Sequence, residues 1–102
     1  MLLKIATTTE GETLHAKLSG EFDLSSIDTF RETIEGSATP WKRAELDMAD
    51  VVFMDSSGLQ ALVSLNNRAR ERGYELTLMR PSHPVTRLLA LTGLESQFTV
   101  RG

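Results

Sequence analysis

Residues 51–59 constrain the fold of this chain more than any other stretch, because two kinds of secondary structure meet there. An apolar run, Val-Val-Phe-Met, ends abruptly in Asp-Ser-Ser-Gly. Apolar positions then recur at helical spacing: Leu59, Leu62, Val63, Asn66 and Ala69, with Asn66 as the one polar member. Spacing of i, i+3, i+4 and i+7 is typical of one face of an α-helix. The stretch therefore predicts a buried strand that passes directly into a helix.

The two serines of this junction have different expected roles. Ser57 is the predicted N-cap of the helix, and Gln60, three residues later, completes a capping box. Ser56 then lies beside the free N–H groups at the positive end of the helix dipole. Such an end stabilises an anion, and phosphate is the common one.

Composition limits the class of protein. The 102 residues predict one small domain, residues 1–102, with a single modest core. A net charge of −3 argues against a nucleic-acid partner, which favours a basic surface. The absence of cysteine excludes disulfides and thiolate chemistry. No apolar run approaches the roughly 20 residues that span a bilayer. The start of the chain lacks the long apolar region of a signal peptide, so we expect a cytoplasmic protein.

Alternating and helical patterns fill the rest of the chain. Two alternating runs around Glu10-Gly11 predict a β-hairpin. Further alternating strands are expected over 44–48 and 74–78, with a short last strand near 98–100. Three helices are expected to end at Gly36, Gly73 and Gly93. The predicted caps are Ser25 or Ser26 for the first helix, Ser57 for the second and Ser82 for the third.

The resulting order, β-β-α-β-α-β-α-β, predicts an α/β fold with a mixed sheet of four to five strands. The first strand is antiparallel to the second, whereas strands separated by a helix run parallel. Sites in such sheets lie beyond the carboxyl ends of the parallel strands. Three loops, 21–24, 54–57 and 80–82, are expected at that edge. We therefore predict one surface that carries Asp23, Asp55 and Ser56.

A phosphate-accepting switch suits this surface better than catalysis. No nucleophile elbow or phosphate-binding loop is present, and His15 and His83 form neither a base nor a metal cluster. We therefore expect no enzyme activity, no metal and no cofactor. A phosphoserine adds a charge of about −1.5 to −2, which the helix dipole favours and nearby carboxylates repel.

Simpler roles for the same residues remain open. Ser56 and Ser57 are also good capping residues. Asp23 suits the end of a strand and the cap of the next helix, and Asp55 suits a buried group that holds the loop. Met48, Phe53 and Met54 are expected in the core. Trp41 is either a partner anchor or a lid over the sheet edge.

The stretch Phe53–Leu59 resembles the signature of the STAS domain of bacterial anti-sigma factor antagonists. Gly20-Glu21-Phe22-Asp23 is similar to the Gly-Glu-hydrophobic-Asp that follows the second strand of that family. The resemblance extends in order over nearly the whole chain. Its late part is carried by the spacing of Ser82, Val85, Leu88, Gly93 and Leu94.

The resemblance implies partner switching. In that family the unphosphorylated antagonist binds an anti-sigma factor, usually also a serine kinase, and so frees a sigma factor. The kinase phosphorylates the first serine after the motif aspartate, here Ser56, and a serine phosphatase of the metal-dependent class resets it. The matching positions for partner and kinase recognition are Asp23, Asp55, Ser57, Gly58 and Leu59.

Two departures and one alternative accompany the resemblance. Gln60 replaces the small or basic residue that often follows Gly-Leu, and the chain ends at Gly102, where many relatives add a helix. STAS-like domains also serve as cytoplasmic subunits of membrane transporters, including lipid-transport ABC permeases. In that alternative the same loop and helix are a constitutive docking surface and Ser56 is not modified. No direct membrane insertion is expected, and the sequence does not predict an oligomeric state.

Overall fold

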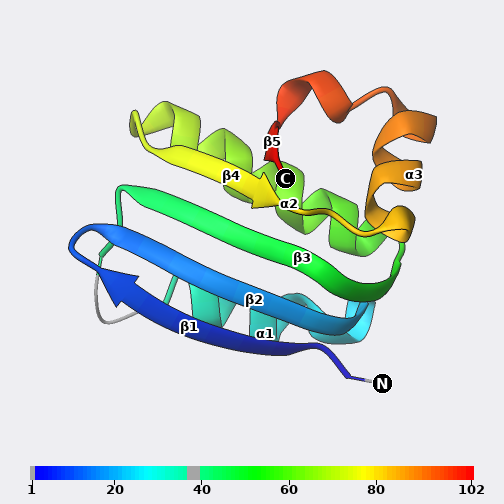
Figure 1. Cartoon of the computed structure of the whole chain (residues 1–102), viewed down its shortest axis with the longest axis horizontal. Helices are drawn as coiled ribbons and strands as arrows, with labels where there is room; N and C mark the ends of the chain where they lie inside the picture. Colours follow the sequence, from blue (N-terminus) through cyan, green and yellow to red (C-terminus); the bar gives the residue numbers. More distant parts are fainter. Residues whose placement is uncertain (1, 37–39) are drawn as a thin grey trace.

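The structure is a computed structural model that describes residues 2–36 and 40–102. Its sheet has the strand order β1-β2-β3-β4-β5 (Figure 1). The strands are β1 (Lys4–Glu10), β2 (Thr13–Phe22), β3 (Arg43–Met54), β4 (Glu75–Met79) and β5 (Thr99–Arg101). β1 is antiparallel to β2, and the remaining pairs are parallel. The predicted mixed sheet, hairpin and element order are confirmed.

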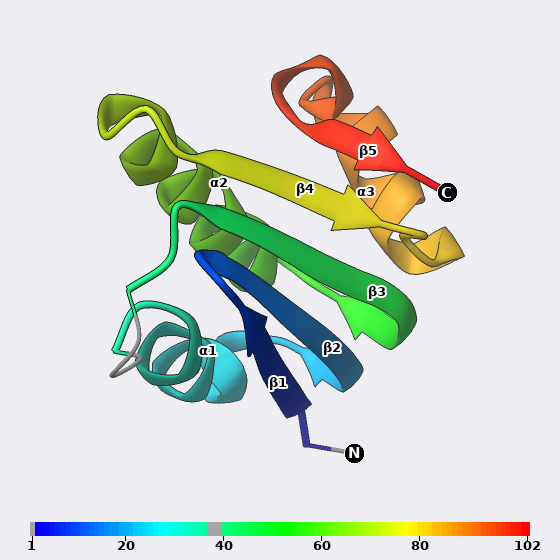
Figure 2. The ribbon, with the colours of Figure 1, turned by 60° about the vertical axis from the view of Figure 1, so that its left-hand side comes forward.

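The α-helices of the described residues lie on one side of this sheet, behind it in the view of Figure 2. They are α1 (Ile27–Ile34), α2 (Ser56–Glu71) and α3 (His83–Thr92). Short 3₁₀ turns, η1 (Leu24–Ser26) and η2 (Glu95–Gln97), precede α1 and follow α3. Gly73 and Gly93 follow their helices with φ values of +72° and +71°, a left-handed conformation that favours glycine. None of the helices among the described residues is long and apolar enough to cross a membrane.

The core fills the space between the helices and one face of the sheet. Strand periodicity explains which side chains of the sheet lie in the core, since alternate side chains point to opposite faces. On β2, Leu14 and Leu18 are buried while His15 and Lys17 face the other way. The rings of Phe22 and Phe30 pack 4.8 Å apart between their centroids, which joins β2 to α1. Burial of this apolar surface is the main driving force for folding.

Trp41 closes one end of the core. Its indole Nε1 donates a hydrogen bond to the carbonyl oxygen of Ile34 at 2.9 Å. Its half-buried ring lies 6.0 Å from the ring of Tyr74, between centroids. Of the two roles open for this residue, the structure therefore supports the lid.

β3 is much longer than its neighbour β4. The last paired residue of β4, Met79, lies opposite Asp47, and β3 continues to Met54 alongside β2. The β2–β3 register shifts twice on the way, between Lys17 and Ser19 and between Gly20 and Glu21. Such irregularities bend a strand and re-aim the side chains that follow it. The end of β3 thus projects beyond β4.

This overhang corrects one prediction. The backbone N–H of Ser82 donates to the carbonyl of Met48 at 3.1 Å, and its hydroxyl donates to the carbonyl of Val51 at 2.6 Å. The loop 80–82 therefore lies against residues 48–51 of β3 and not beyond the end of the strand. Only two of the three predicted loops, 21–24 and 54–57, meet beyond the carboxyl ends of the strands. Spacing along the chain could not reveal which residue of β3 lies opposite the end of β4.

Candidate functional site

The site is the paired end of β2 and β3. Phe22 and Met54 are opposite each other as the last residues of the two strands. One residue further on, the backbone N–H of Asp55 donates to the carbonyl oxygen of Phe22 at 3.3 Å. The turn that begins at Asp23 and the start of α2 are therefore side by side, as the topology predicts.

Asp55 is the N-cap of α2. Its carboxylate accepts hydrogen bonds from the backbone N–H groups of Ser57 (2.9 Å) and Gly58 (3.1 Å). Its backbone is extended, with φ −109° and ψ −174°, and the helix begins at the next residue. The prediction that Ser57 caps the helix is wrong by two residues. Asp and Ser are comparable caps, and only the position where the strand ends selects between them.

Ser56 is the first residue of α2, and its side chain is exposed. Within residues 2–36 and 40–102, neither the Ser56 nor the Ser57 hydroxyl forms a hydrogen bond. Ser57 is half-buried in the first turn. The hydroxyl of Ser56 is therefore the more accessible nucleophile of the two, at the positive end of a 16-residue helix.

Gly58 and Leu59 lie in the interior. A Cβ atom at Gly58 would be 2.4 Å from the carbonyl oxygen of Phe22 and 3.0 Å from Cγ of Met54. Glycine is needed here because the α2 backbone packs directly on the end of β2. Leu59 is 5% exposed and belongs to the core. These two residues position α2.

Asp23 caps the turn η1. Its Oδ1 accepts from the Ser25 hydroxyl at 2.6 Å, the Ser25 N–H at 3.0 Å and the Ser26 hydroxyl at 3.2 Å. The Ser25 hydroxyl is the main cause that holds the pKa of Asp23 below its ordinary value. The carboxyl group is therefore ionised and fixed beside the start of α2.

The predicted cap of α1 is right in position only. Ser26 occupies the N-cap position of α1, but its side chain makes no capping hydrogen bond. Its hydroxyl instead donates to the carbonyl of Glu21 at 2.8 Å. Asp23 carries out the capping, one turn earlier, because the chain enters α1 through a 3₁₀ turn. This matches the structural role left open for Asp23.

Exposed apolar side chains surround the site, and the sequence patterns did not single them out. Leu24 is 75% exposed, Val52 58% and Phe53 48%. Phe53 was expected in the core with Met48 and Met54, and that prediction is wrong for Phe53 alone. The register shifts near the end of β2–β3 turn its side chain outward. Large exposed apolar side chains at one place are typical of interaction surfaces.

A hollow of about 240 Å³ lies beside the site, between α1 and α2. Leu24, Ile27 and Arg31 line one wall, and Ser57 and Gln60 begin the other. The hollow thus combines an exposed apolar side chain, a cation and a hydroxyl. Gln60, the residue at which the family pattern departs, is exposed here.

The histidines lie elsewhere. His15, on β2, pairs with Glu45 of β3, and His83 is the first residue of α3. Among the described residues, no group of three His, Cys, Asp or Glu side chains is arranged to hold a metal ion.

Known proteins similar to this chain share its family. The STAS domain model matches residues 4–101. A STAS-domain containing protein of Pseudomonas aeruginosa (strain UCBPP-PA14) is 26% identical over 100 residues, which cover 98% of this chain and 99% of that protein. The anti-sigma-B factor antagonist of Staphylococcus aureus (strain NCTC 8325) is 28% identical over 96 residues, covering 93% and 89%.

Solved structures share the fold. A Thermotoga maritima protein assigned to the anti-sigma factor antagonists has a TM-score of 0.87 at 18% identity, covering 96% of this chain and 86% of that one. The phosphorylated form of the Bacillus cell fate determinant SpoIIAA has a TM-score of 0.74 at 19% identity, covering 96% and 89%. Since the family model spans nearly its whole length, the chain belongs to the STAS domain family.

Proposed function

We propose that this protein is an anti-sigma factor antagonist, a regulatory binding module that exchanges partners when Ser56 is phosphorylated. The observation that carries the proposal is the position of Ser56: exposed, first in α2, and without a hydrogen bond to its hydroxyl in the described part of the chain. The likeness to a Staphylococcus antagonist and to SpoIIAA, which is known in a phosphorylated form, supports it.

In the unphosphorylated state, the end of β2–β3 and the start of α2 dock an anti-sigma factor and so release a sigma factor in the cytoplasm. The exposed side chains of Leu24, Val52 and Phe53 supply apolar contact area there. Apolar side chains at the centre of an interface contribute most of the binding free energy.

Phosphorylation changes the charge of this surface. The anti-sigma factor acts as a serine kinase: Oγ of Ser56 bonds to the γ-phosphorus of ATP, the bond from that phosphorus to the bridging oxygen breaks, and ADP and the hydroxyl proton are released. Asp55 already occupies the N–H groups of Ser57 and Gly58. The phosphate therefore remains exposed near two carboxylates, those of Asp23 and Asp55, and repels the partner. A serine phosphatase restores the binding state.

The other predicted recognition residues have distinct parts in this scheme. Asp23 offers a fixed carboxylate for kinase recognition, and Asp55 presents Ser56 by ending β3 and starting α2. Ser57 lines the adjacent hollow. Gly58 and Leu59 act from the interior by holding α2 against β2.

Two substitutions test the switch. Ser56→Ala should fold and bind the anti-sigma factor permanently, whereas Ser56→Asp should fold and bind at least about tenfold more weakly, a difference of about 1.4 kcal/mol. Ser96→Ala is the control, because it removes an exposed hydroxyl in η2, away from the site, and should still be phosphorylated on Ser56. Equal binding by the alanine and aspartate variants of Ser56 would contradict the switch.

Modification in the cell is the second test. Intact-mass spectrometry and peptide mapping of protein from its native cell, before and after phosphatase treatment, should show a removable phosphate on Ser56. If no phosphate appears across growth conditions and a permease and its ATPase co-purify instead, the protein is a transporter subunit and the proposal fails.

A further inference from the structure

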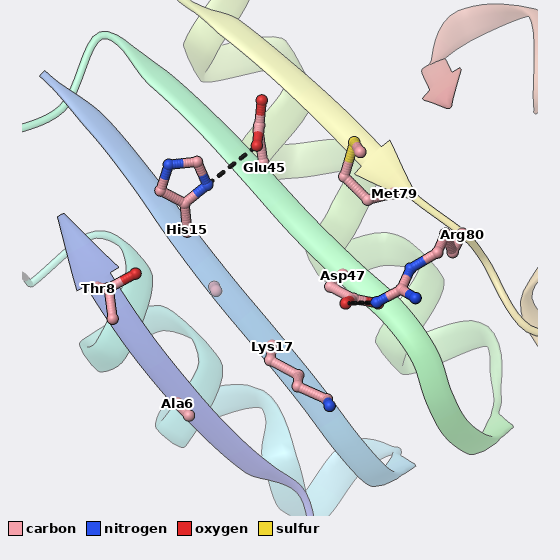
Figure 3. A pocket seen from close by; sticks show the side chains of 9 residues that line it. Ala6, Thr8, His15, Lys17, Glu45, Asp47, Met79 and Arg80 are labelled. Carbon is pink, nitrogen blue, oxygen red and sulfur yellow. Dashed lines mark hydrogen bonds and ion pairs between the residues drawn. The ribbon is translucent and has the colours of Figure 1, made fainter. Parts of the chain in front are cut away.

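The face of the sheet opposite the helices is uncovered by any helix of the described residues (Figure 2). A shallow hollow of about 500 Å³ crosses this face from β1 to β4 (Figure 3). Its lining alternates cationic and anionic side chains, with small or apolar residues at the two ends. The arrangement follows from the strand register, which places these side chains in rows across the sheet.

Two successive rows carry the pattern. The first runs Ala6, Lys17, Asp47, Met79 across β1, β2, β3 and β4. The second runs Thr8, His15, Glu45, Thr77 across the same strands. In both rows β2 contributes the basic residue and β3 the acidic one.

Over the four strands β1 to β4, each row is complementary to the same row read in the opposite direction. β5 adds Thr99 and Arg101 beyond β4, outside these four facing strands. Consider a two-fold axis between two facing sheets, parallel to the strands and midway between β2 and β3. This axis places β2 of one copy over β3 of the other, and β1 over β4. Lys17 then faces Asp47, and His15 faces Glu45. At the ends of the first row, the long Met79 faces the small Ala6. At the ends of the second row, Thr8 is exposed and lies over Thr77, which is buried within its own chain.

We propose that this sheet face binds a second copy of the chain in an isologous dimer about that axis. A two-fold interface requires a surface that is complementary to itself, and a surface for an unrelated partner does not. Two antiparallel or mixed sheets can pack face to face about 10 Å apart. The flexible Met79 side chain fills the space that Ala6 leaves open.

The charged side chains of these rows already form ion pairs within one copy, and they can still contact the facing copy. Lys17 pairs with Asp50 at 3.5 Å, and both side chains are more than half exposed. His15 Nδ1 lies 2.9 Å from Glu45, and Arg80 pairs with Asp47. Each carboxylate has a second lone-pair direction for a cation of the facing copy. Burial of charges is costly, so the dimer is weak, specific and sensitive to salt.

The contact is confined to the two matching rows. The row next to His15 and Glu45 runs Glu10, Thr13, Arg43, Glu75 across β1 to β4. In the dimer, Glu10 of one copy would face Glu75 of the other. Twisted sheets pack at about −30°, which separates their corners and keeps these exposed side chains apart. The helices lie on the opposite side of the sheet, so Ser56 stays accessible in the dimer. The inference is therefore independent of the proposed function.

Sedimentation velocity over a concentration series tests the dimer. The wild-type sedimentation coefficient should rise with concentration, and less so at high salt. Lys17→Glu and Asp47→Lys each place like charges in contact and should weaken self-association at least tenfold. An equimolar mixture of the two variants should dimerise, because each reversed charge then meets an opposite one. Arg87→Glu, on exposed α3, is the control with the same charge change as Lys17→Glu, and should dimerise as wild type.

Ala6→Glu provides a second probe, at the end of the first row and beside Lys17. Ala6 is exposed on an edge strand, so the variant should fold, which circular dichroism will verify. Its larger side chain should collide with Met79 of the facing copy and weaken the dimer. The proposal is overturned if the wild type is monomeric throughout the series. It is also overturned if Ala6→Glu and both charge variants dimerise like wild type, or if the mixture of charge variants fails to associate.

Discussion

At the scale of single residues, Asp55 is the residue of the site that holds the start of α2 in place. Its carboxylate accepts hydrogen bonds from two backbone N–H groups of α2 that would otherwise lack a partner. Asp55→Ala should therefore lower the free energy of unfolding by about 0.5–2 kcal/mol, the usual loss for an N-cap. Urea unfolding, monitored by circular dichroism, will measure this decrease.

Asp55→Asn is the matched control for that experiment. Its amide oxygen accepts the same hydrogen bonds without the charge, and Asn and Asp are comparable caps. We expect it to retain most of the stability that Asp55→Ala loses. Equal stability of all three proteins would show that the capping geometry contributes nothing.

At the scale of elements, Ser82 links α3 to the projecting part of β3. Its hydroxyl donates to the carbonyl of Val51, four residues before Asp55, while β4 no longer pairs with this part of β3. Ser82→Ala should lower the free energy of unfolding by about 1 kcal/mol, the usual net contribution of a hydrogen bond. It should also speed amide hydrogen exchange at the end of β3.

Ser96→Ala is the control for Ser82→Ala. Ser96 is exposed in η2 and its hydroxyl forms no hydrogen bond within the described ranges. The control should leave both unfolding and exchange unchanged. If Ser82→Ala behaves in the same way, packing of α3 alone holds the end of β3 in place.

At the scale of the whole molecule, two carboxyl groups make stability depend on acid pH. Hydrogen bonds, first of all from the Ser25 hydroxyl, lower the pKa of Asp23. At Asp47, partial burial acts to raise the pKa. The hydrogen bonds from the Ala49 N–H and Arg80, with the charges of Arg80 and Lys17, outweigh it and lower the pKa.

A group whose pKa is lowered by folding stabilises the protein above its unfolded pKa and loses that effect as pH falls through the folded pKa. We therefore expect the free energy of unfolding to decrease below about pH 4. Asp47→Asn should reduce this decrease, by about 1 kcal/mol or less, because its pair with Arg80 is partly exposed. Parallel pH profiles for the variant and the wild type, from urea unfolding, would contradict the role of Asp47.

Local patterns in the sequence were sufficient for much of the fold. Alternation at Leu14, Ala16 and Leu18, and helical spacing from Leu59 onward, are properties of neighbouring residues. They predicted the order of elements, the antiparallel first strand and the meeting of Asp23 with the Asp55–Ser56 junction. The cap of α2 was harder to predict, since Asp55, Ser56 and Ser57 are all good capping residues. The residue that caps the helix is decided by where β3 stops pairing with β2.

By itself, then, the sequence determined that a buried strand passes into a helix at Asp-Ser-Ser-Gly, and that parallel strands bring Asp23 to the same edge. These features depend on periodicity and chirality, which act over a few residues or over one crossover. Only the tertiary structure decided that β3 extends beyond the end of β4, that the side chain of Phe53 points outward, and that β2 and β3 align Lys17 with Asp47. Each of these depends on strand register, and register is set by contacts between residues far apart in the chain.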